Sequence, residues 1–424
     1  MLHYYITSLL VLSFFLVAYS LFLLKRSGVH LLTIGFLQGF GYSLCYPLIL
    51  LIYFGKDYNG KRVDDILSFR GICWLFVCFF LLFLGKELSV FSMKIRNKDT
   101  VLTSLKKAKG YNFSSTVNIF CLFSFVYLYF YYIWNDFQIH KGIFRYGWFS
   151  PIFICCIFSI SNLFLLNSFF CEKRNKLSML LNLLITSIYF VSMPQFKTFS
   201  FGIFINIIFP ILLFIFIKNI SVKRFVFFLL FLVFASSLCS WQRSRTENGI
   251  SGFQRWALQP SGTMLCLKQP DKPNQGLFWV KRMFSRLLPN AKDNAKVSFG
   301  TFCVYAFYNG EKDFEALKNK KREPRSFAVN FLGEADLFFG YNGLFFILIL
   351  GFCLGLLDVW FGRHRQFLLV YFFTSVNLCF GALTSSSFLS SCIKSGILPM
   401  LLIILCESIK LKYKHSPIQN TEMF

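Results

Sequence analysis

The sequence predicts an all-α, polytopic integral membrane protein of about 11 (10–12) transmembrane helices, with one long external loop that contains short amphipathic helices. Of the 424 residues, 56% are hydrophobic and only 15% are charged, whereas soluble domains carry about a quarter charged residues. Apolar segments of roughly 18–25 residues recur, and helices of that length satisfy their own backbone across a bilayer core of about 30 Å. A long polar stretch, residues 241–335, interrupts these segments.

Eleven apolar segments are candidate transmembrane helices. The first begins at the N-terminus, and we expect it to be a true membrane helix because no Lys or Arg precedes it, unlike in a cleaved signal peptide. The chain then divides into a bundle of about eight helices (1–240), a large loop (241–335), about three further helices (336–409) and a tail (410–424). The spans lie at about 4–24, 29–54, 71–85, 114–134, 148–170, 177–193, 199–217, 222–240, 337–360, 366–385 and 396–409.

The distribution of Lys and Arg predicts the orientation, because short loops rich in these residues stay in the cytoplasm. One set of alternate connections carries 20 basic residues, and the short loops of the other set carry 8. This difference puts the N-terminus outside, the C-terminus inside and the loop 241–335 outside, which in a bacterium is the periplasm. The basic stretch 86–113 is expected to lie on the cytoplasmic leaflet as a solvated anchor.

The formal net charge of +25 fits this topology and contact with anionic headgroups. We find no motif for binding nucleic acid. Ionisable residues within the spans are few, with Asp358 near the cytoplasmic end of its span as the main acidic candidate, whereas an ion-coupled carrier usually needs one near the midplane. Cys266 and Cys303 in the long loop could form a disulfide if that loop faces an oxidising compartment.

The long loop carries 16 Lys and Arg against 8 Asp and Glu. That excess fits an anionic ligand such as a phosphate or pyrophosphate, and it fits equally a solvated surface beside anionic lipid. Within it, residues 277–288 (LFWVKRMFSRLL) alternate at helical spacing, which predicts a short amphipathic helix on the membrane surface. Arg282 and Arg286 would project from one face of it and grip a diphosphate, or would reach to lipid headgroups.

The closing part of the loop places Asn330, Glu334 and Asp336 just ahead of an unbroken apolar span that starts near Leu337. If this part is helical, Asn330 and Glu334 share a face. A carboxylate at the mouth of a membrane helix can deprotonate a sugar hydroxyl. Glu334 fits that role, and it also fits an ordinary interfacial acid that the helix dipole favours.

The stretch FLGEADLFFGYNGLFFILILGFCLGLL resembles the C-terminal signature of the O-antigen and exopolysaccharide repeat-unit polymerases, the Wzy family. In both, an acidic residue is followed by an aromatic-Gly-x-x-Gly helix entrance and a glycine-punctuated apolar helix. The upstream MFSRLLPNAKDN is similar to an Arg- and Pro-containing element of the same large periplasmic loop. The layout of about a dozen spans with one long external loop near the C-terminal third agrees with the family. The chain departs from the family's pattern in two ways: eleven spans with an external N-terminus differ from its common even count, and Arg-Leu-Leu-Pro lacks the Trp-Pro that often follows the Arg.

The resemblance implies glycosyl transfer in the inner membrane, without a metal or other cofactor, between two oligosaccharides linked to undecaprenyl diphosphate. Arginines stabilise a departing lipid diphosphate without a metal, and no D-x-D motif in the external loops would hold one. A chain-length regulator and a flippase are the expected partners, together with membrane lipids. The candidate residues are Arg286, Arg255 and Arg282 for the diphosphate, Arg325 and Asn330 for substrate binding, Glu334 as the acceptor base or its orienter, and Arg145 and His140 as secondary contacts.

Two other functions remain open at this point. An O-antigen ligase would share the donor and the basic external loop but would pass the glycan to lipid A–core. A lipid-linked oligosaccharide flippase, or another carrier, would perform no chemistry.

Overall fold

The computed structural model describes residues 2–26, 30–54, 63–93, 260–268, 329–364, 367–381, 388–389, 392–401, 403–405 and 408 of the chain. Throughout these ranges the secondary structure is helical, and no strand occurs in them. This confirms the helical class for the described part. The five spans expected between residues 114 and 240, and the amphipathic helix expected at 277–288, lie outside it.

Four helical segments within the described ranges are long and apolar enough to cross a membrane: Leu2–Lys25, Leu31–Tyr53, Phe69–Ser92 and Phe331–Arg363. Each coincides with a span expected from hydropathy. The long helix α20 (Leu368–Gly381) and the π-helical turn η7 (Ile393–Ile397) lie within or at the edge of two further expected spans.

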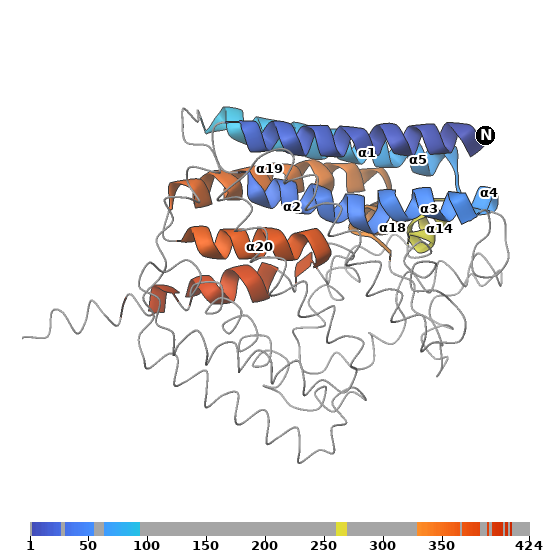
Figure 1. The fold of residues 1–424 in the computed structure, drawn as a ribbon. Coiled ribbons are helices and arrows are strands. Elements are labelled where there is room, and N and C mark those ends of the chain that lie inside the picture. The colour runs from blue at the N-terminus through green and yellow to red at the C-terminus, as the bar shows by residue number, and fades with distance from the viewer. Residues whose placement is uncertain are drawn as a thin grey trace, which may run out of the picture.

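The described helices pack in layers (Figure 1). Helices α1 (Leu2–Lys25) and α5 (Phe69–Ser92) form the upper layer, with the short α4 (Val63–Ile66) preceding α5. Below them lie α19 (Gly343–Arg363) and the continuous run of α2 (Leu31–Phe40), η1 (Gly41–Cys45) and α3 (Tyr46–Phe54). Helix α20 follows beneath. Buried Leu and Phe side chains fill the space between the layers.

Helices α1, α5 and α19 run in one direction, and α2 and α20 run in the other. Close contacts establish this: Arg26 at the end of α1 contacts Glu87 near the end of α5, and the start of α2 contacts Asp358 near the end of α19. Leu31 of α2 likewise contacts Tyr371 of α20. The C-terminal ends of α1, α5 and α19 therefore lie at one end of the bundle, as the alternation of the expected spans predicts.

Small residues allow α5 and α19 to pack backbone to backbone. A Cβ added to Gly351 would overlap the Leu82 carbonyl, and one added to Gly355 would overlap the Ser89 hydroxyl. Gly85 on α5 is held equally close to the α19 backbone. The four-residue spacing of Gly351 and Gly355 is the small-residue pattern by which membrane helices approach closely.

The predicted end of the third span, at residue 85, is wrong. Helix α5 continues to Ser92, so Lys86 and Glu87 lie inside the helix and not in a solvated anchor. Lys86 is completely buried, and its ammonium group donates to Glu87 at 3.1 Å. Hydropathy ended the span early because it scores each charge alone, whereas here the two charges have partners within the bundle.

The span expected from about Leu337 is present, but the expectation that it is unbroken is wrong. The chain forms α18 (Phe331–Phe339), a single 3₁₀ turn η5 (Gly340–Asn342) and then α19. Gly340 has φ of 54°, a conformation that side-chain-bearing residues rarely adopt. A Cβ on Gly343 would overlap the carbonyl of Ala335, whereas eight residues of straight helix would separate them by about 12 Å. The Gly-x-x-Gly sequence is thus a sharp turn between two helices.

Candidate functional site

The closing part of the long loop folds against an earlier piece of the same loop. Helix α14 (Ser261–Lys268) packs on α18, and both lie at the end of the bundle where α5 begins (Figure 1). Every residue of α14 from Ser261 to Leu267 is buried. We call the polar residues gathered here the α18 cluster; they are Ser43, Arg70, Thr263, Asn330, Glu334 and Asp336.

Asn330 is the N-cap of α18. Its side-chain oxygen accepts from the Leu332 N–H at 3.1 Å, which satisfies one of the amides that a helix start leaves without a partner. Its side-chain amide donates to Ser43 Oγ at 3.0 Å, and its own N–H donates to Thr263 Oγ1 at 2.8 Å. Asn330 therefore joins α18 to η1 and α14, and it precedes the first helical residue as the cap.

Glu334 lies in the first turn of α18, where the positive end of the helix dipole favours a carboxylate. Its N–H donates to the Asn330 carbonyl at 2.9 Å, so the cap fixes its backbone. The residue is only 4% exposed. Both expected roles, general base and interfacial acid, are compatible with this position.

Asp336 is buried, and Arg70 from the first turn of α5 contacts it. The distance from Arg70 Nη2 to Asp336 Oδ1 is 3.3 Å, and the guanidinium also lies 5.9 Å from the centre of the Tyr341 ring. One turn further along α5, the Trp74 indole donates to the Leu332 carbonyl at 3.2 Å. Two side chains of α5 thus hold α18 in place.

Cys266 lies on the buried face of α14. Its Sγ is 3.8 Å from the Gly333 carbonyl. Gly333 itself fits tightly, because a Cβ there would press on the Thr263 side chain. Cys303, the other half of the expected disulfide, lies outside the described residues.

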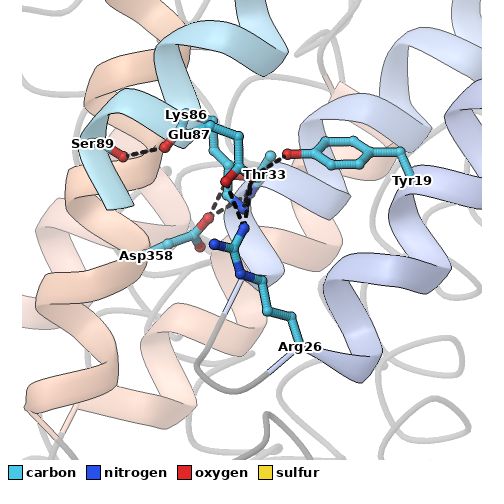
Figure 2. Close-up of polar contacts among 7 residues, drawn as sticks. All are labelled: Tyr19, Arg26, Thr33, Lys86, Glu87, Ser89 and Asp358. Carbon is cyan, nitrogen blue, oxygen red and sulfur yellow. Dashed lines mark hydrogen bonds and ion pairs between the residues drawn. The ribbon is translucent and has the colours of Figure 1, made fainter. Parts of the chain in front are cut away.

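A second polar group occupies the opposite end of the bundle (Figure 2). We call it the Asp358 cluster; it comprises Tyr19, Arg26, Thr33, Lys86, Glu87, Asp358 and Tyr371. At its centre Arg26 binds Glu87 through two contacts, at 2.8 and 2.6 Å. The hydroxyl of Tyr19 donates to the same carboxylate at 2.9 Å. The Lys86 ammonium lies 5.7 Å from the centre of the Tyr19 ring.

Asp358 caps a helix that is distant in sequence. Its two oxygens accept from the N–H groups of Leu32 and Thr33 at 2.9 and 3.2 Å, and from the Thr33 hydroxyl at 2.5 Å. The Tyr371 hydroxyl also donates to it, so one carboxylate joins α19, α2 and α20. Asp358 is completely buried, and the position near one end of the bundle agrees with the sequence-based expectation.

Of the predicted site residues, Asn330 and Glu334 lie in the α18 cluster. The others lie outside the described residues: Arg286, Arg255, Arg282, Arg325, Arg145 and His140. Sequence reasoning missed Arg70. A usable signal was present, because a cation in the first turn of a helix opposes the dipole and requires a compensating partner.

Among the described residues, no three His, Cys, Asp or Glu side chains gather in a way that could hold a metal ion.

Comparison with known proteins gives no relative from which a function can be transferred. No protein-family model, no curated protein and no solved structure matches this chain.

Proposed function

We propose that this chain is a polysaccharide polymerase of the bacterial inner membrane. It transfers a growing glycan from undecaprenyl diphosphate to a sugar hydroxyl of a lipid-linked repeat unit at the periplasmic face. The observation that carries the proposal is the α18 cluster. Two parts of the long polar loop pack there at one end of a bundle of apolar helices, and a buried carboxylate, Glu334, occupies the start of a capped helix.

Such a reaction needs a base that is held rigidly beside the acceptor hydroxyl. Preorganisation of this kind lowers the barrier because the reacting groups need not be ordered during the step. Glu334 meets the requirement, since the Asn330 cap and the two α5 contacts fix α18 around it. In the proposal Glu334 accepts the proton of the attacking hydroxyl, or orients that hydroxyl.

Departure of the lipid diphosphate develops negative charge, which arginine side chains stabilise. Arg286, Arg255 and Arg282 are proposed for this role, with Arg325, Arg145 and His140 as further substrate contacts. No metal enters the proposed reaction. The polymerase would act together with a flippase that supplies the repeat unit and with a chain-length regulator.

The test is a deletion of the gene, complemented by the wild-type protein or by Glu334→Gln. Extracted lipopolysaccharide and the lipid-linked pool are analysed together. We expect the deletion and Glu334→Gln to leave core oligosaccharide carrying a single repeat unit, with the wild type restoring a full ladder. Asp65→Asn is the matched control, because Asp65 is an exposed carboxylate at the same end of the bundle. A full ladder from Glu334→Gln at normal expression removes Glu334 from the site.

The same samples separate the alternatives. Loss of all O-antigen from core, with polymer still present on the lipid carrier, would identify a ligase. Repeat units trapped on the cytoplasmic leaflet would identify a flippase.

One observation specifically supports the carrier alternative. The Asp358 cluster places three charged side chains within the helices and a fourth, Arg26, directly after α1, and intramembrane charges often mark transport pathways. However, the cluster lies near the ends of α1, α5 and α19 instead of their middles, and Asp358 accepts hydrogen bonds from backbone amides and hydroxyls. We therefore keep the carrier as an alternative and not as the proposed function.

A further inference from the structure

Arg70 is placed where a cation is electrostatically unfavourable. Helix α5 begins at Phe69, and the Ser68 side chain caps it by accepting from the Gly71 N–H. Arg70 thus sits in the first turn, at the positive end of the helix dipole. A negative partner must offset this, and the buried Asp336 supplies part of the compensation.

Asp336 contacts only one nitrogen of the Arg70 guanidinium. The Arg70 side chain is 41% exposed, and its contact with Asp336 is a single one of 3.3 Å. A guanidinium has five N–H donors in a planar fork, and charge-assisted bonds to carboxylates are typically about 2.7–2.9 Å long. In the Asp358 cluster, Arg26 meets Glu87 with two contacts of 2.8 and 2.6 Å. The Arg70 guanidinium therefore keeps donors for another anion.

The setting of Arg70 is that of a membrane interface. Phe69 and Tyr341 are both 76% exposed, and Tyr341 lies beside the guanidinium. Exposed aromatic residues at the ends of membrane helices sit at the level of the lipid headgroups. The anion within reach is therefore one carried by a lipid at the interface.

We infer that Arg70 binds the diphosphate of the polyprenyl-linked oligosaccharide, with Asp336 and Tyr341 holding its guanidinium toward the membrane surface. This inference rests on the proposed function and adds a substrate-binding residue from outside the long loop. Because α18 also carries Glu334, the contact between Arg70 and Asp336 links diphosphate binding to the helix of the proposed base. The planar fork of Arg70 suits the paired phosphates better than a point charge would.

The experiment measures lipid binding and not polymerisation. The full-length protein, in phosphatidylcholine nanodiscs, is titrated with undecaprenyl diphosphate and separately with phosphatidylglycerol, and binding is read by native mass spectrometry. We expect Arg70→Gln to raise the Kd for undecaprenyl diphosphate about tenfold or more, the effect of losing a charge-assisted hydrogen bond. The Kd for phosphatidylglycerol should change less than about twofold. Lys268→Gln, which removes a nearby exposed cation, should leave both unchanged.

Removal of Arg70 takes a cation away from the buried Asp336, so a second variant guards against misfolding. Arg70→Gln/Asp336→Asn removes both charges and leaves a polar side chain at each position, and it should show the same selective loss. An unchanged Kd in both variants overturns the inference, as does an equal loss for both lipids, which would indicate a general headgroup contact. If the wild type itself does not bind undecaprenyl diphosphate, the proposed function fails as well.

Discussion

Two arginine–carboxylate pairs lie at opposite ends of the helix bundle and differ in the number and length of their contacts. Arg26 binds both oxygens of Glu87 through Nη1, and Tyr19 and Lys86 complete the surroundings of that carboxylate. Arg70 makes one longer contact with Asp336, and its side chain is 41% exposed, against 29% for Arg26. The first pair is therefore tight and held by further side chains, whereas the second is looser and more open. Pairing alone does not distinguish a structural ion pair from a binding site; the closeness of the contact and the exposure of the guanidinium do.

The Asp358 cluster is also balanced in charge. Arg26 and Lys86 face Glu87 and Asp358, so the group as a whole carries no formal excess (Figure 2). Buried charges are tolerated when each has a partner and hydrogen bonds to its remaining atoms. Lys86 and Asp358 are both completely buried; Lys86 is paired with Glu87, and Asp358 accepts hydrogen bonds at both of its oxygens. These contacts assign the Asp358 cluster to stability, whereas the α18 cluster carries the proposed function.

The largest expected effect is at Asp358. Asp358→Ala removes the acceptor for two helix-start amides and two hydroxyls at a completely buried position, and should lower the free energy of unfolding by about 3–5 kcal/mol. Asp358→Asn keeps one acceptor oxygen in place and should cost about half as much. Unfolding in SDS titrations of the purified protein measures both. Losses under about 1 kcal/mol for the Ala variant would show that the cap does not stabilise the bundle.

A double-mutant cycle on each pair tests the comparison directly. Combining Arg26→Gln with Glu87→Gln should give a coupling energy of about 1–2 kcal/mol, reduced by solvent because both side chains are about a quarter exposed. Combining Arg70→Gln with Asp336→Asn should give a smaller coupling, below about 1 kcal/mol. Equal couplings would remove the distinction between the tight pair and the loose pair.

Substitutions of Asn330 test whether the fixed position of α18 matters for the proposed function. Asn330→Ala removes the N-cap of α18 and should cost about 1 kcal/mol of stability, as N-cap losses do. Asn330→Asp loses the bond that the Asn330 amide donates to Ser43 Oγ. It keeps the capping oxygen, so it should retain most of that stability. Polymer length on lipopolysaccharide gels should fall more for Ala than for Asp. Full-length ladders from Asn330→Ala would show that a fixed α18 is unnecessary.

The smallest expected change in stability is at Arg70. Arg70→Gln should lower the free energy of unfolding by less than about 1 kcal/mol, because the side chain is half-exposed and its single contact is screened. The matched change in the other pair, Arg26→Gln, should cost more. SDS titrations run side by side decide the order, and a reversed order would place the structural pair at the α18 end.

The sequence predicted the helices that hydropathy alone determines. The expected spans at 4–24 and 29–54 agree with α1 and with the α2–α3 run, because their apolar residues are continuous. The sequence-based prediction was wrong where long-range contacts determine the end of a helix. The extension of α5 through Lys86 depends on Arg26, which lies about 60 residues earlier. Hydropathy cannot represent that dependence.

The sequence contains local signals for the start and the end of α18, but the prediction did not use them to separate α18 from the span that follows. Asn330 ahead of an apolar run is a typical N-cap, and Gly340 with Gly343 is a typical helix break. Treating the apolar residues that follow as one span hid both. That Arg70 lies beside Asp336 could not be predicted, since 266 residues separate them. Which face of a helix meets which partner is determined by packing and not by local pattern.

The cap that Asp358 places on α2 has a consequence for biogenesis. Leu32 lies 326 residues ahead of Asp358, so the ribosome completes α2 long before it makes the group that satisfies the first amides of that helix. At about 5–20 residues per second the interval is roughly 15–65 seconds. During that time the start of α2 must remain in contact with water, headgroups or the insertion machinery. The start of α2 therefore lacks its final hydrogen-bond acceptor until α19 has been synthesised.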